Sequence, residues 1–158
     1  MEFTRVNFRP SFFGDRPLVL LEDGELKATA FRYESGVCGL KIENEHCSMV
    51  VLPYMGQQIW FAEFEGRNLT QKSIFDQPLA TTKFGDNYGG LLLHCGLTNI
   101  NCPGDGEDYP IHGELPFANY PETYAGIGRD EAGTYLAVGG TFVYRNSQEY
   151  HYAKSEAK

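Results

Sequence analysis

The sequence predicts an all-β fold, an antiparallel β-sandwich made of a single domain over residues 1–158. Aromatic residues make up 14% of the chain and glycine occurs 18 times, a composition that favours pleated strands joined by turns. Short runs of alternating apolar and polar residues are separated by turn signals about every 8–12 residues. No window shows the 3.6-residue apolar period of an amphipathic helix. A chain of this length is long enough to bury a core of its own.

The first half of the chain contains a series of predicted strands. Phe3, Val6 and Phe8 open a short segment that we expect to be an edge strand or an arm. Asp23-Gly24 has the composition of a hairpin turn. Alternation or a short apolar run predicts five strands, over residues 18–21, 26–31, 38–43, 49–52 and 59–64.

The second half is less regular until its last third. Residues 70–83 lose the alternation, which predicts an irregular crossing with at most one helical turn. Strands are predicted over residues 120–127 and 135–144, the latter with Leu136 and Val138 on one face. A last strand is expected to begin near 149–152, and the remaining residues, YAKSEAK, are expected to form a polar tail.

The charge balance excludes several classes of partner. Lys and Arg total 13 against 21 Asp and Glu, for a net charge of −8. Such a surface repels phosphate backbones and anionic lipids, so we expect neither nucleic acid nor a membrane as partner. The first ten residues, MEFTRVNFRP, do not resemble a signal peptide, and no run approaches the roughly 20 apolar residues of a membrane helix. A cytoplasmic location is therefore expected.

Cysteine and histidine spacing gives no support for a metal centre. The four cysteines form no CxxC pair, and we interpret them as small buried apolar side chains: Cys38, Cys47, Cys95 and Cys102. One alternative is a zinc site formed by His94 or Cys95 together with Cys102 and His112. Structural zinc sites usually show closely spaced ligand pairs, and this sequence has none. We therefore expect no metal and no cofactor.

Titratable residues concentrate in the stretch from Phe84 to Pro116, so function is most expected there. Its acidic loop, residues 105–108, lacks the ligand spacing of a calcium loop and is interpreted as a solvated rim. A lone histidine is usually structural. However, His112 follows a loop rich in Gly, Pro and acids, and Gly113 directly after it would let a ligand approach the backbone.

Three motifs in order carry a family resemblance: Leu52-Pro53-Tyr54-Met55-Gly56, then Gly89-Gly90, then His112-Gly113. Together they resemble the galactose mutarotase (aldose 1-epimerase) superfamily, specifically an uncharacterised branch of it. The resemblance covers roughly residues 47 to 145 and corresponds to the N-terminal half of the family's β-supersandwich.

The resemblance implies that the chain binds a sugar, with isomerase activity that opens and recloses the sugar ring. His112 matches the family's catalytic histidine, and an imidazole with a pKa of about 6.5 suits that task. Tyr88 stands where sugar-phosphate epimerases carry an arginine, so a non-phosphorylated sugar is expected. Tyr88 and Trp60 are the two aromatic rings on which a sugar face could stack, although Trp60 is expected in the core. Residues assigned to substrate binding are Asp86, Asn87, Tyr88, His94 and Glu114.

The family's glutamate base and second histidine come from a later half that this chain does not contain. Two hypotheses follow. The chain is one half of an aldose epimerase, or it is a non-catalytic sugar-binding or interaction module that keeps the fold. A half-sandwich would also expose an apolar face and unpaired strand edges, so we expect a homo-oligomer or a complementing second chain.

Overall fold

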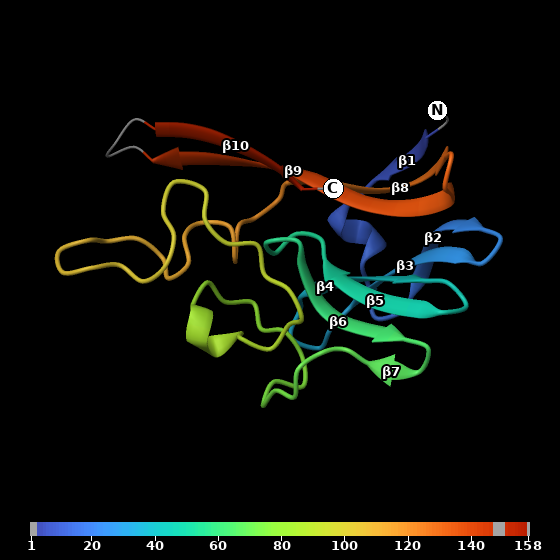
Figure 1. Ribbon diagram of the computed structural model, residues 1–158, viewed down its shortest axis with the longest axis horizontal. Helices are drawn as coiled ribbons and strands as arrows, with labels where there is room; N and C mark the ends of the chain where they lie inside the picture. The colour runs from blue at the N-terminus through green and yellow to red at the C-terminus, as the bar shows by residue number, and fades with distance from the viewer. Residues whose placement is uncertain (1–2, 147–150, 158) are drawn as a thin grey trace.

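The computed structural model describes residues 3–146 and 151–157 and consists of two antiparallel β-sheets packed face to face (Figure 1). The predicted all-β antiparallel sandwich is confirmed. The six-stranded sheet contains, in spatial order, β2 (Leu18–Asp23), β3 (Leu26–Arg32), β4 (Cys38–Glu43), β5 (Cys47–Leu52), β6 (Gln58–Phe64) and β7 (Arg67–Asn68). The four-stranded sheet contains β1 (Phe3–Asn7), β8 (Glu122–Asp130), β9 (Gly133–Asn146) and β10 (His151–Ala157).

The six-stranded sheet is a meander in which each strand pairs with the next one along the chain. All five strands predicted from alternation between residues 18 and 64 are present, with β5 and β6 starting slightly earlier than expected. The short strand β7 is not among the predicted strands. It forms because the tight turn at Glu65 and Gly66, both with positive φ, folds Arg67 back to pair with Phe64.

The four-stranded sheet joins the two ends of the chain. The first strand, β1, is an edge strand as expected, and Phe3 pairs with Gly128 of β8. The polar tail predicted at the C-terminus is wrong, because this segment forms β10 and pairs with β9. Backbone pairing does not require apolar side chains, so the polar composition did not reveal the strand. Residues 147–150, where part of the last strand was predicted, lie outside the described residues.

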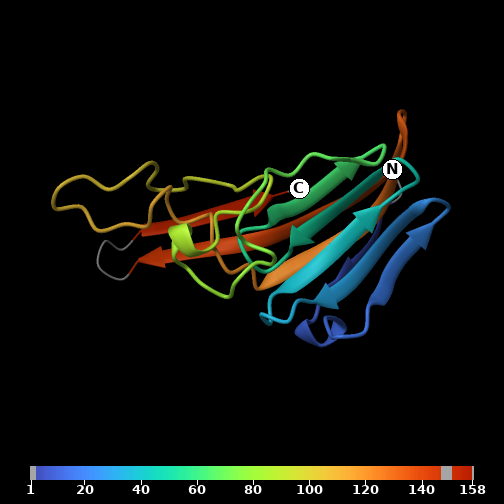
Figure 2. The ribbon, with the colours of Figure 1, turned by 90° about the horizontal axis from the view of Figure 1, so that it is seen from below.

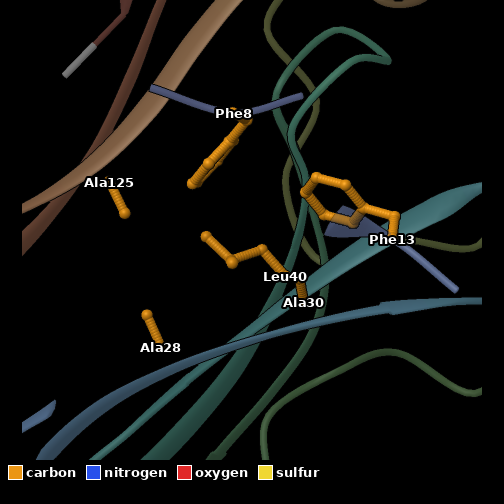
Figure 3. Close-up of a cluster of buried hydrophobic side chains, with 6 residues drawn as sticks. All are labelled: Phe8, Phe13, Ala28, Ala30, Leu40 and Ala125. Atoms are coloured by element: carbon orange, nitrogen blue, oxygen red, sulfur yellow. The ribbon is translucent and has the colours of Figure 1, made fainter. Parts of the chain in front are cut away.

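The sandwich core lies between the two sheets (Figure 3). Leu136 and Val138 of β9 pack against it on the face predicted from alternation. The sheets are aligned so that β2 contacts β8 and β3 contacts β9. Burial of each large core side chain contributes about 2 kcal/mol to folding. The core residues are Phe8, Phe13, Ala28, Ala30, Leu40 and Ala125.

A second apolar cluster is built around Trp60, which is only 6% exposed. A β-bulge between Val50 and Val51 leaves Trp60 without a direct partner in the β5–β6 register. The indole packs with Val50 and Leu52. Trp60 is therefore a core residue, as expected.

The chain between β7 and β8 forms long loops that gather at one end of the sandwich, beside the β9–β10 hairpin (Figures 1 and 2). The expected irregular crossing over residues 70–83 is confirmed. His94 lies in these loops and not in a strand, and the segment before it makes only an isolated bridge between Ile59 and Leu92. The two 3₁₀ turns are η1 (Pro10–Phe12) and η2 (Phe84–Asp86). Within the described residues, no helix has the length and apolar character needed to cross a membrane.

Candidate functional site

Four rings meet within the long loops, and we call them the aromatic cluster: Phe84, Tyr88, His112 and Phe117. Phe84 lies at the centre. Its ring centroid is 4.7 Å from that of His112, 5.1 Å from Tyr88 and 6.3 Å from Phe117. Tyr88 is 52% exposed, whereas the other three rings are half-buried. In this cluster, therefore, the Tyr88 ring faces solvent, whereas the other three rings are partly covered.

A groove of about 480 Å³ adjoins this cluster and shares Phe117 with it. Polar side chains that are exposed on the groove include Thr82, Lys83 and Asn119. The site thus combines apolar rings with hydroxyl, amide and ammonium groups, the usual make-up of a small-molecule site. The groove is lined by Tyr54, Met55, Ala80, Thr81, Thr82, Lys83, Phe117 and Asn119.

His112 is positioned by its own backbone. It adopts a left-handed conformation with φ of 65°, which is unfavourable for a residue other than glycine. Two hydrogen bonds hold it there: its N–H donates to the carbonyl of Asn101 over 2.6 Å, and its carbonyl accepts from the N–H of Gly96 over 2.8 Å. The loop is therefore fixed at the point where the imidazole meets Phe84.

The glycines of the two sequence motifs are explained by packing within the protein. A Cβ on Gly113 would collide with the carbonyl oxygen of Asn99 and lie 2.9 Å from the Cα of Gly96. A Cβ on Gly89 would lie 2.9 Å from Cη2 of Trp60. In both motifs the missing side chain makes room for the chain's own backbone or core, a packing role that the sequence did not reveal.

Glu114 ties together two turns of the loop. Its carboxylate accepts hydrogen bonds from the backbone N–H groups of Thr98 and Asn99, from the Thr98 hydroxyl at 2.6 Å and from the Asn99 amide at 2.7 Å. Partial burial acts to raise the pKa of Glu114, but these hydrogen bonds outweigh it and lower the pKa. Both carboxylate oxygens are occupied, so Glu114 holds the loop that carries His112.

This lowered pKa gives a prediction for stability against pH. The folded state binds the Glu114 proton less tightly than the unfolded chain, in which the carboxyl titrates near 4.5. The stabilisation is therefore complete above about pH 4.5 and is lost as the pH falls through the lowered pKa. We expect Glu114→Gln to reduce the free energy of unfolding by about 1 kcal/mol near neutral pH, since the group is only partly buried, and by less at about pH 3.

Urea denaturation at the two pH values measures this difference. Glu131→Gln, in the exposed turn between β8 and β9, is the matched control and should change stability little at either pH. An equal loss for Glu114→Gln at both pH values would contradict the role assigned to the carboxylate.

Asn87 lies beneath the site and faces inward. Its side chain is fully buried, its Oδ1 accepts from the N–H of Leu79 at 2.9 Å, and its Nδ2 donates to the carbonyl of Leu79 and to Sδ of Met55. Because its polar atoms are engaged within the protein, we leave Asn87 out of the proposed site. It fixes the loop that forms one wall of the groove.

The remaining predicted site residues are placed differently. Asp86 is exposed at the end of η2, and in the sequence it lies between Phe84 and Tyr88 of the aromatic cluster. His94 is half-buried, and in the described part of the chain no hydrogen bond or ring contact links it to His112. The structure thus brings His112 and Tyr88 together on Phe84 and leaves His94 outside. Phe84 and Phe117 were missed, although Phe84 begins the stretch and Phe117 directly follows its last residue.

No group of three His, Cys, Asp or Glu side chains that could hold a metal ion occurs among the residues that the structure describes. All four cysteines are free thiols. Cys38 and Cys47 are half-buried, but Cys95 and Cys102 are exposed. The interpretation of the last two as buried residues is wrong, because both lie in the long loops and not in a strand of either sheet.

No protein-family model matches this chain, no curated protein matches its sequence, and no solved structure matches it.

Proposed function

We propose that the protein binds a non-phosphorylated sugar at the aromatic cluster and its groove, without converting it. The observation that carries this proposal is the exposed ring of Tyr88, set on Phe84 beside a groove of about 480 Å³. A sugar has an apolar face of C–H groups and a rim of hydroxyls. The C–H face stacks on the Tyr88 ring, and the hydroxyls reach the polar side chains of the groove.

Charge favours a neutral ligand over an anionic one. The chain carries a net charge of −8, and Asp86 is exposed beside the cluster. Lys83 is a basic side chain on the groove. A single lysine in this acidic setting is a weak phosphate site compared with clustered arginines, which is consistent with a free sugar as ligand.

Binding without turnover is the version that the geometry favours. Opening a sugar ring requires an acid and a base on opposite sides of one substrate. His112 supplies one titratable group, and its resemblance to a mutarotase histidine supports a place in the site. The acidic residue nearest to it in sequence, Glu114, is engaged by Thr98 and Asn99. No carboxylate that could act as the base occurs among the described residues that line the groove.

Calorimetric titration with a panel of free aldoses tests the proposal. We expect saturable binding by the parent chain, about tenfold weaker binding by Tyr88→Ala, and near-parent binding by Tyr88→Phe, which keeps the ring. Tyr135→Ala, on the outer face of the four-stranded sheet beside Phe3, is the control and should bind like the parent. Equal affinities for the parent and Tyr88→Ala would remove the cluster from the site.

Polarimetry with the same sugars separates binding from catalysis. The proposal predicts no acceleration of mutarotation by the parent chain. An acceleration that disappears in His112→Ala would replace it with the epimerase function that the resemblance implies.

A further inference from the structure

We propose that the free edge of β9 accepts an extended segment of a partner polypeptide, which joins the four-stranded sheet as a further strand. On one side of β9, β8 pairs along residues 133–141. On the other side, β10 pairs only along residues 140–146. Residues 133–139 therefore have one edge with which no strand of the described residues pairs, and we call it the open edge.

The open edge lacks the features that normally protect a strand from pairing. Its sequence is GTYLAVG, without a charged residue or a proline. Soluble proteins usually place charges, prolines or very short strands at sheet edges. The four edge strands of the described sheets follow this rule: β7 has only two residues, and the other three carry charges, Arg5 in β1, Glu22 and Asp23 in β2, and Lys154 and Glu156 in β10. The open edge is thus suited to backbone pairing.

An apolar slot lies directly beside the open edge, between the two sheets. Its volume is about 270 Å³, and it is lined by Leu26, Ile42, Glu43, Asn44, Cys47, Met49, Thr134, Tyr135 and Leu136. A cavity of about 150 Å³ holds a benzene molecule, so the slot has room for an apolar side chain. Alternate side chains of a strand added to β9 would point into the slot, toward Ile42 and Met49.

The alignment of the two sheets explains why the slot is open. Because β2 contacts β8 and β3 contacts β9, the strands from β4 to β7 extend past β9 on the side of the open edge. An added strand would lie over β4 and β5, toward the exposed side chain of Phe64 on β6. The same overhang opposes antiparallel pairing of the open edges of two copies, because both six-stranded sheets would then project over the same side of the joined sheet.

Charge indicates the composition of the segment. Asp130 and Glu131 are exposed at the turn where the open edge begins, whereas Glu43 on the slot is already ion-paired with Lys41. The whole chain is acidic, with a net charge of −8. The segment that fits is therefore extended, with apolar residues at alternate positions facing the slot and basic residues between them facing solvent.

A synthetic peptide of about nine residues, with valine and leucine alternating with lysine and threonine, is the probe for this edge. Amide hydrogen exchange of the whole chain, followed by NMR, is measured with and without it. We expect slowed exchange in residues 134–138 and unchanged exchange in β1, whose outer edge is the internal reference. The same peptide with a central proline should give no protection, since proline removes a ladder hydrogen bond.

Two threonine variants complete the test. Thr134 is exposed and lines the slot, so Thr134→Lys should weaken peptide binding at least tenfold. Thr4→Lys, an exposed threonine on β1, should leave it unchanged. Absence of protection in residues 134–138, or equal binding by Thr134→Lys and the parent, would overturn the proposal. So would a peptide-free dimer that protects the same amides, which would assign the open edge to a second copy.

Discussion

Replacing Gly56 with alanine is expected to lower the free energy of unfolding by about 4 kcal/mol. Gly56 has φ of 57°, and a Cβ there would collide with the carbonyl oxygen of Pro116 and lie 2.7 Å from that of Leu115. These are backbone atoms and cannot rotate away. The Gly56 N–H also donates to the carbonyl of Ala118 at 2.8 Å, so any shift breaks the contact that fastens the long loops to the sandwich.

Gly66→Ala is the matched control for this prediction. Gly66 has φ of 71°, close to that of Gly56, but no atom lies within 4 Å of a Cβ built on it. Its replacement should cost about 1 kcal/mol, the price of the left-handed conformation alone. Urea denaturation of the two variants separates conformation from crowding. Similar losses for both would mean that the loop near Pro116 relaxes freely.

Replacing Asn87 with alanine is expected to lower the free energy of unfolding by about 3 kcal/mol. The change removes the Asn87 partner of the Leu79 N–H and one of the two partners of the Leu79 carbonyl, which also accepts from the N–H of Thr81, and it opens space beneath Met55. Thermal and urea denaturation measure the effect. We expect sugar affinity, measured on the folded fraction, to stay within a few-fold of the parent.

Asn119→Ala provides the comparison, because Asn119 is exposed on the groove. It should change stability by less than about 0.5 kcal/mol. If Asn87→Ala were equally harmless to stability and instead weakened sugar binding, the residue would return to the site as a ligand contact.

The strands of the six-stranded sheet could be predicted because burial there has a period of two. Ala28 and Ala30 of β3 are buried, and the residues on either side of each are only half-buried. The sequence pattern therefore matches the structural one. The last strand, β10, could not be found in this way, since its composition is polar and its pairing with β9 depends on the backbone.

The candidate site was less predictable because its contacts join residues far apart in an irregular chain. Phe84 meets His112 and Phe117 without any sequence period that would signal it. Gly113 was expected to let a ligand approach the backbone, yet it lies against Asn99, and Gly89 of the second motif lies against Trp60. In a loop, a glycine indicates that another group comes close to the backbone, but only the fold shows which group it is.

The pairing of β1 with β8 also has a consequence for the order of folding. Every strand of the six-stranded sheet pairs with its neighbour in sequence, so this sheet can assemble locally. The four-stranded sheet has to bring Phe3 to Gly128, across most of the chain. Pairing of such high contact order is slow. Until β8 and β9 are synthesised, one face of the meander has no covering sheet, and this interval is when the chain is most exposed to aggregation.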